Sequence, residues 1–135
     1  MGTFARVPPR RSAELTASKR ILLVDDSALI RATAADALDT AGFDVTVRAA
    51  FDELLAHGTE GFDLILMDVH MPELYGDDVA FTLRGERGVK TPIYLFSSID
   101  ETELAGLAAD AGIDGYIPKS VGLDELVARV RAILR

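Results

Sequence analysis

Leu64-Ile65-Leu66-Met67-Asp68 is the stretch that decides the fold of this chain. Four apolar residues in a row, without polar alternation, are typical of a strand that is buried on both faces, as in a parallel sheet. The run ends abruptly in a carboxylate. Because ligands of open α/β sheets bind beyond the carboxyl ends of the strands, we expect Asp68 to be the reactive group.

From Arg20 onward the chain alternates apolar runs with segments of helical periodicity. Strands are predicted at 21–24, 44–47, 64–67, 93–96 and 115–117, and helices at about 27–40, 51–57, 77–84, 100–111 and 123–134. Ser27 and Asp100 are expected to cap two of the helices, and residues 69–76 are predicted to form a loop. This alternation indicates an α/β fold built from repeated βα units around a parallel sheet.

The length and composition fit one domain that needs no disulfide. The chain has 135 residues and no cysteine, which excludes thiol catalysis and cysteine-based zinc sites. No segment reaches the roughly 18 apolar residues of a membrane span, and the N-terminus lacks the apolar core of a signal peptide. We therefore expect a cytoplasmic protein without a membrane partner.

Charge is unevenly distributed along the chain. The net charge is −8, although residues 1–19 hold four basic residues against one acidic residue. We interpret 1–19 as a basic disordered leader and 20–135 as one acidic domain, which disfavours nucleic-acid binding by the latter. The last predicted helix ends the chain, so no effector domain is expected.

Polar residues follow the strands at one edge of the predicted sheet: Asp25 and Asp26, Asp68, Ser97 and Lys119. Three clustered carboxylates repel one another, which raises a pKa unless a cation joins them, and hard oxygen ligands suit Mg²⁺. A carboxylate beside Mg²⁺, with a lysine and a hydroxyl facing it, is equipped for phosphoryl transfer. The predicted product is an acyl phosphate on Asp68.

Together these motifs resemble the receiver domain of two-component response regulators, and among them the single-domain chemotaxis response regulators. The matching segments are 24–27, 66–68 with Met71-Pro72 and Gly76, Ser97-Ser98, and Gly115-Tyr116 with Lys119. The resemblance implies a flavodoxin-like, doubly wound, five-stranded parallel sheet of order 2-1-3-4-5 with five helices.

The resemblance also implies residue roles. Asp68 would be the phosphoacceptor, and Asp25, Asp26, Asp68 and the backbone carbonyl of His70 would hold Mg²⁺. Ser97 and Tyr116 would form a switch, and Lys119 would pair with the phosphoryl group.

The implied partners are a histidine kinase or phosphotransfer protein, which donates the phosphoryl group, and a downstream target protein. The target would bind the face formed by residues 100–111, 115–117 and 123–134. The domain would catalyse only its own phosphorylation and dephosphorylation, so it is not expected to be an enzyme acting on other substrates.

Two residues depart from the family pattern. Tyr75 stands where an acidic residue is common, and Ser120 replaces the proline that usually follows the lysine across a cis peptide. Because a cis peptide before a non-proline residue costs roughly 3 to 4 kcal/mol, we predict a trans bond between Lys119 and Ser120. We also expect Lys119 to lie farther from Asp68, with slower activation.

His70 and Ile99 occupy the variable positions that, in this family, tune how fast water removes the phosphoryl group.

Other interpretations of the same residues stay open. Asp25 and Asp26 alone suit helix-terminus electrostatics, Asp68 alone suits a turn, and Lys119 and Tyr116 alone suit surface and packing roles. One alternative function is a degenerate receiver that binds partners without phosphorylation. Another is a Mg²⁺-dependent phosphatase with an aspartyl nucleophile, although that class of enzyme requires a second carboxylate two residues after the nucleophile, where this chain has His70.

Overall fold

The structure is a computed structural model that describes residues 18–71 and 74–135. Most of the predicted basic leader (1–17) and Pro72 of the expected motif lie outside the described residues. The strands are β1 (Arg20–Val24), β2 (Asp44–Arg48), β3 (Leu64–Met67), β4 (His70–Met71), β5 (Leu74–Tyr75), β6 (Ile93–Ser97) and β7 (Gly115–Pro118). The helices are α2 (Ala28–Thr40), α3 (Phe51–His57), α4 (Gly76–Gly85), α5 (Glu101–Ala111) and α6 (Leu123–Ile133), with a 3₁₀ turn η1 (Lys119–Val121).

The main sheet has five parallel strands in the order β2-β1-β3-β6-β7. This is the predicted order 2-1-3-4-5, so the expected doubly wound, flavodoxin-like α/β fold is confirmed. The strand 44–48, whose sequence alternates, lies at one edge of the sheet, also as predicted. β3 lies at the centre, between β1 and β6.

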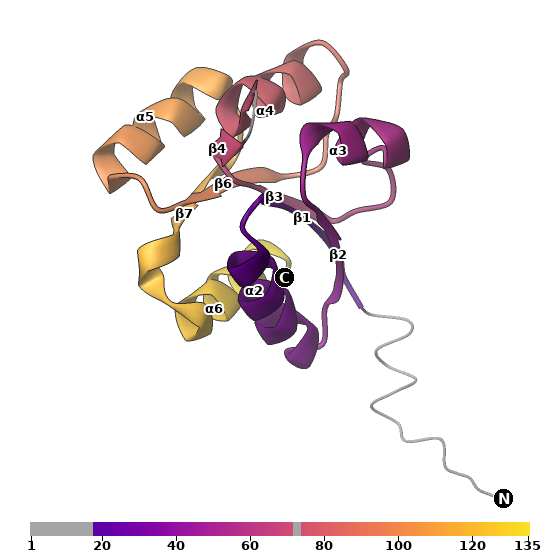
Figure 1. Cartoon of the computed structure of the whole chain (residues 1–135), viewed down its shortest axis with the longest axis vertical. Coiled ribbons are helices and arrows are strands. Elements are labelled where there is room, and N and C mark those ends of the chain that lie inside the picture. The colour runs from indigo at the N-terminus through magenta and orange to yellow at the C-terminus, as the bar shows by residue number, and fades with distance from the viewer. Residues whose placement is uncertain (1–17, 72–73) are drawn as a thin grey trace, which may run out of the picture.

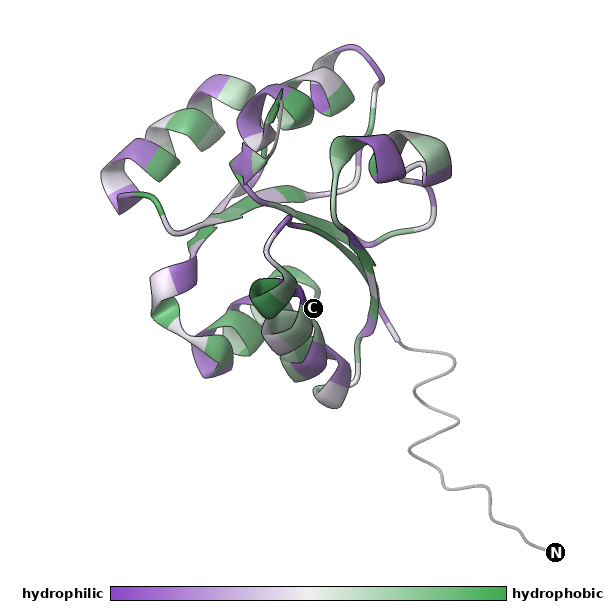
Figure 2. Ribbon diagram, viewed as in Figure 1, coloured by the Kyte–Doolittle hydropathy of each residue, from purple (hydrophilic) through white to green (hydrophobic). Residues whose placement is uncertain are grey.

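Helices cover both faces of the sheet (Figure 1): α3, α4 and α5 lie on one face, and α2 and α6 on the other. All four side chains of β3 are fully buried. Leu64 and Leu66 pack toward α2 and α6, while Ile65 and Met67 pack toward the other three helices. Burying one such side chain contributes about 1.5 to 3 kcal/mol, which explains the uninterrupted apolar run. Figure 2 shows this apolar layer between the two helical layers.

Two helix starts are fixed by side-chain caps that the sequence predicted. The Ser27 hydroxyl accepts a hydrogen bond from the Ile30 N–H at the start of α2. The Asp100 carboxylate accepts from the backbone N–H groups of Thr102 and Glu103 at the start of α5. Each cap satisfies backbone donors that have no partner within the helix. Each of these helices begins four residues after the last residue of the preceding strand.

The segment after Asp68 differs from the prediction of a plain loop. His70 pairs with Tyr75, and Met71 with Leu74, in a short antiparallel hairpin. Strands of two residues have no periodicity that a sequence pattern could reveal. The hairpin leads directly into α4.

None of the helices in the described part of the chain is long and apolar enough to cross a membrane.

Candidate functional site

The carboxyl ends of neighbouring strands bring the predicted residues to one edge of the sheet. In the pairing of β1 with β3, Val24 lies opposite Met67, so Asp25 and Asp68 leave the sheet side by side. The Asp68 N–H donates to the Val24 carbonyl at 2.9 Å. The positions of both aspartates are therefore set by the register of buried strands.

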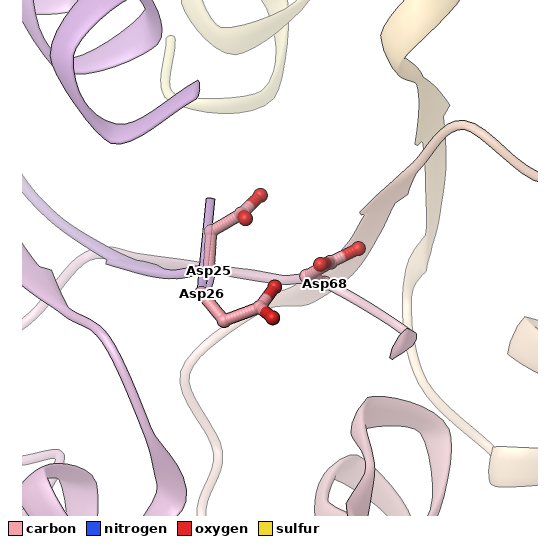
Figure 3. Close-up of side chains that lie close together, drawn as sticks. All are labelled: Asp25, Asp26 and Asp68. Atoms are coloured by element: carbon pink, nitrogen blue, oxygen red, sulfur yellow. The ribbon is translucent and has the colours of Figure 1, made fainter. Parts of the chain in front are cut away.

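Asp25, Asp26 and Asp68 each place a carboxylate oxygen within 4.8 Å of the others. Figure 3 shows the three side chains gathered where β1 and β3 end. Asp25 is 0% exposed and Asp68 is 6% exposed, whereas Asp26 reaches the solvent. This arrangement combines an open side with two nearly buried charges.

Lys119 supplies the ammonium of the cluster. Its Nζ lies 2.7 Å from Asp25 Oδ2 and 3.5 Å from Asp68 Oδ1. Asp25 Oδ1 accepts from the Ser27 N–H, but within the described part of the chain the buried Oδ2 makes no hydrogen bond beyond its ion pair with Lys119. One ammonium therefore pairs with two of the three carboxylates of the cluster.

Burial raises the pKa of the Asp68 carboxyl from its usual 3.8 to about 6, and the negative charge of Asp25 contributes to this rise. Lys119 and the hydrogen bond from the Val69 N–H lower this pKa but do not cancel the rise. The surroundings of Asp68 thus supply too little positive charge to balance its ionised carboxylate. Three oxygens from separate carboxylates, with the Lys119 ammonium as the cation paired with two of these side chains, form a donor set that fits Mg²⁺.

The predicted trans peptide after Lys119 is confirmed, since the described residues contain no cis peptide bond. The expected greater distance between Lys119 and Asp68 is wrong, because Nζ lies 3.5 Å from Asp68 Oδ1. Lys119 follows the last residue of β7 and opens the 3₁₀ turn η1. From there its long stem is sufficient to bring the ammonium back to the strand ends.

Gly76 packs against the backbone of Asp68 and Val69. Its N–H donates to the Val69 carbonyl at 2.7 Å, and a Cβ at this position would lie 1.6 Å from the backbone oxygen of Asp68. Only glycine allows the start of α4 to pack so closely on the chain that carries Asp68.

Ser97 and Tyr116 occupy the two strands beyond β3. Ser97 ends β6, is 2% exposed, and accepts a hydrogen bond from the Ile99 N–H through its hydroxyl oxygen. Tyr116 lies on β7 with its ring packed partly against the core, and its hydroxyl donates to Glu101 Oε2 at 3.1 Å. The hydrogen bond to Glu101 raises the pKa of Tyr116. Tyr116 is therefore held with its hydroxyl outward.

His70 is exposed, and its ring lies edge-on to the ring of Tyr75, with 5.9 Å between the ring centroids. It lies on the hairpin beside the site. Its backbone carbonyl as a metal ligand stays a prediction.

Two contacts of the site were not predicted. Arg31 in α2 donates from Nη1 to the backbone carbonyl of Asp25, and Glu101 in α5 accepts from Tyr116. Neither residue belongs to a motif, because both act through contacts that the fold creates. The contact of Arg31 could have been predicted only from its spacing to Asp25, which places an arginine in the helix that follows the Asp25 loop.

Residues 21–131 match the response regulator receiver domain family. The chain belongs to this family. The match includes all five strands of the main sheet, apart from Arg20, and all three carboxylates, so the resemblance drawn from the sequence is confirmed.

The relatives of this chain include response regulators from Mycobacterium and Klebsiella. The response regulator MprA of Mycobacterium tuberculosis is 37% identical over 126 residues, which cover 87% of this chain and 51% of MprA. The transcriptional regulatory protein CpxR of Klebsiella pneumoniae is 37% identical, over 86% of this chain and 49% of CpxR. The chain spans about half the length of these relatives.

Solved receiver structures share the fold. The receiver domain of the Francisella response regulator 1452 is 30% identical with a TM-score of 0.77, covering 87% of this chain and 97% of that one. A CheY-like receiver domain protein from Methanospirillum hungatei is 28% identical with a TM-score of 0.76, covering 87% and 94%.

These comparisons leave three expectations as predictions. A stand-alone arrangement is not shown, because the relatives are about twice as long as the matched region. The absence of nucleic-acid binding is not confirmed, since CpxR is named a transcriptional regulatory protein. The cytoplasmic location also stays a prediction.

Proposed function

We propose that the Asp68 carboxylate accepts a phosphoryl group from a histidine kinase or phosphotransfer protein, and that this stand-alone receiver then binds a target protein. One observation carries the proposal: Asp68 is a nearly buried carboxylate, at the end of the central strand, that faces both an ammonium and further carboxylates. Perturbed carboxylates at a strand end are where chemistry is expected in open α/β sheets.

In the proposed transfer, an Asp68 oxygen attacks phosphorus, and the bond from phosphorus to the donor atom breaks as the acyl phosphate forms. Lys119 is placed to pair with the phosphoryl oxygens, because its Nζ is already 3.5 Å from Asp68 Oδ1. A bound Mg²⁺ ion would neutralise charge on the same oxygens. Asp25, Asp26 and Asp68 would hold it, with the His70 carbonyl as a further ligand.

The proposed output uses the face formed by α5, β7 and α6. Ser97 would leave its hydrogen bond with Ile99 and donate its hydroxyl to a phosphoryl oxygen. Tyr116 would then release Glu101 and turn inward, which couples the site to α5 and to β7. The domain would act on no other substrate and would catalyse only its own phosphorylation and dephosphorylation.

The test is the intact mass of the protein after incubation with acetyl phosphate and MgCl₂. Wild type should gain one phosphoryl group, while Asp68→Asn and wild type in EDTA should gain none. Asp39→Asn, at an exposed position on α2, serves as the control and should behave as wild type. A folded wild-type protein that gains no mass would instead support a degenerate receiver that binds its partner without phosphorylation.

A second candidate output is control of transcription, which the name of CpxR favours. The domain itself is acidic, so any contact with DNA would have to come from other residues. Titration of residues 18–135 with duplex DNA at low salt should show no binding. Binding there would overturn the proposal that this domain acts only on proteins.

A further inference from the structure

The loop between β1 and α2 carries two of the three carboxylates of the site, and its main chain is held by few contacts. The Asp25 N–H donates to the Arg48 carbonyl at 3.0 Å, and the Ser27 N–H donates to Asp25 Oδ1 at 2.8 Å. The second contact closes a turn around the peptide that joins Asp25 to Asp26, but neither contact engages the Asp25 carbonyl oxygen. The orientation of this carbonyl depends on a separate donor.

Arg31 supplies that donor. Its Nη1 donates to the carbonyl oxygen of Asp25 at 2.9 Å in a partly buried position. No backbone donor to this carbonyl is found among residues 18–71 and 74–135. Helical side chains lean toward the N-terminus of their helix, which lets Arg31, in the first turn of α2, reach back over the loop.

The position of Arg31 is electrostatically unfavourable for the helix. A cation in the first turn faces the positive end of the helix dipole, which is unfavourable. The hydrogen bond to the Asp25 carbonyl offsets this cost. An arginine at this place is therefore explained by the loop that it contacts rather than by the helix that carries it.

We propose that Arg31 is a positioning residue for the metal site. By fixing the plane of the peptide between Asp25 and Asp26, it keeps the exposed Asp26 carboxylate aimed at the oxygens of Asp25 and Asp68. This inference rests on the proposed function. A purely electrostatic role predicts the opposite effect on metal binding, since the guanidinium charge repels a cation.

The test is calorimetric titration of metal-free protein with MgCl₂. Arg31→Met removes the donor and the charge but keeps much of the stem, and it should weaken Mg²⁺ binding by about 10-fold, as expected for partners that orient metal ligands. Arg31→Lys keeps the charge with a single donor group and should give an intermediate affinity. Thr33→Val, on the same helix, should bind as wild type does.

The outcomes separate the two proposals. If wild type binds no Mg²⁺, the proposed metal site is wrong. If wild type binds and Arg31→Met binds equally well or more tightly, the positioning role of Arg31 is wrong. If Arg31→Met does not fold, Arg31→Lys decides: weaker binding than wild type supports positioning, and equal binding overturns it. Faster amide exchange at Asp26 and Ser27 in EDTA, in whichever variant folds, should accompany the weaker binding.

Discussion

The two ends of the sheet both carry charged side chains, but they balance charge in opposite ways. At the amino end, the Asp114 carboxylate accepts hydrogen bonds from Arg84 and from the Ile93 N–H, and Arg84 also donates to the Thr91 carbonyl. At the carboxyl end, Lys119 faces Asp25 and Asp68, with Asp26 nearby. Charge is paired at the first end and excessively negative at the second.

This difference separates a structural ion pair from a ligand site. Arg84 and Asp114 tie α4 to the starts of β6 and β7, so the pair holds elements together. At the carboxyl end, burial and the negative charge of Asp25 raise the pKa of Asp68 to about 6. Clustered carboxylates repel one another and destabilise the metal-free folded state, so the binding of a cation should stabilise the protein.

The largest expected effect concerns the close packing behind the carboxyl end. Gly76→Ala would drive a Cβ into the backbone of Asp68, so we expect a loss of about 3 kcal/mol in the free energy of unfolding. Urea denaturation measures this change. Gly106→Ala, where a Cβ meets nothing within 4 Å, is the control and should stabilise α5 by up to about 1 kcal/mol. Equal stability of Gly76→Ala and wild type would show that α4 does not pack as described.

The paired amino end should be destabilised when one partner is removed. Asp114→Ala leaves Arg84 and the Ile93 N–H without their acceptor, which should cost about 2 kcal/mol in unfolding free energy. Glu125→Ala, which breaks the exposed pair with Arg129, should cost less than about 0.5 kcal/mol. If both substitutions have the same small effect, the amino end is not held by its ion pair.

At the carboxyl end, removing one charged side chain should stabilise the protein rather than destabilise it. The folded state binds the Asp68 proton more tightly than the unfolded state, so stability falls as pH rises from about 4 through about 6. Asp68→Asn removes this loss and should stabilise the metal-free protein at pH 7.5 by about 1 to 2 kcal/mol, after allowance for solvent screening. At pH 4 the two proteins should unfold at similar urea concentrations. A variant less stable than wild type at pH 7.5 in EDTA would contradict the charge imbalance.

The smallest effect lies at the rim, where Glu101 accepts from Tyr116. Glu101→Gln weakens the hydrogen bond that holds the phenol proton and removes the carboxylate charge, so the pKa of Tyr116 should fall toward 10. Ultraviolet difference spectra measured against Tyr116→Phe would assign the titration. Glu103→Gln should leave it unchanged, and stability should change by less than about 0.5 kcal/mol in both variants. An unaltered Tyr116 titration in Glu101→Gln would mean that this contact is not formed.

The sequence predicted the sheet and the carboxylate cluster because both depend on strand ends. Apolar runs such as 64–67 define buried strands, and parallel strands bring the residues after each run to one edge of the sheet. Asp25, Asp26, Asp68 and Lys119 were found together for this reason.

Features that depend on tertiary contacts were missed or predicted wrongly. The hairpin of His70 with Tyr75 is too short for a periodic pattern, and Arg31 donates to a backbone carbonyl that any residue would offer. The reach of Lys119 depends on rotamers of its flexible stem rather than on the peptide that comes after it.

The central claim is that Asp68 is the phosphoacceptor, and chemical mapping of the modified residue tests it most directly. Protein treated with acetyl phosphate and MgCl₂ would be reduced with borohydride, which converts an aspartyl phosphate to homoserine, and then digested and sequenced by mass spectrometry. We predict homoserine at position 68, with Asp25 and Asp26 unchanged. Homoserine at another aspartate, or none in a protein that binds Mg²⁺, would contradict the claim.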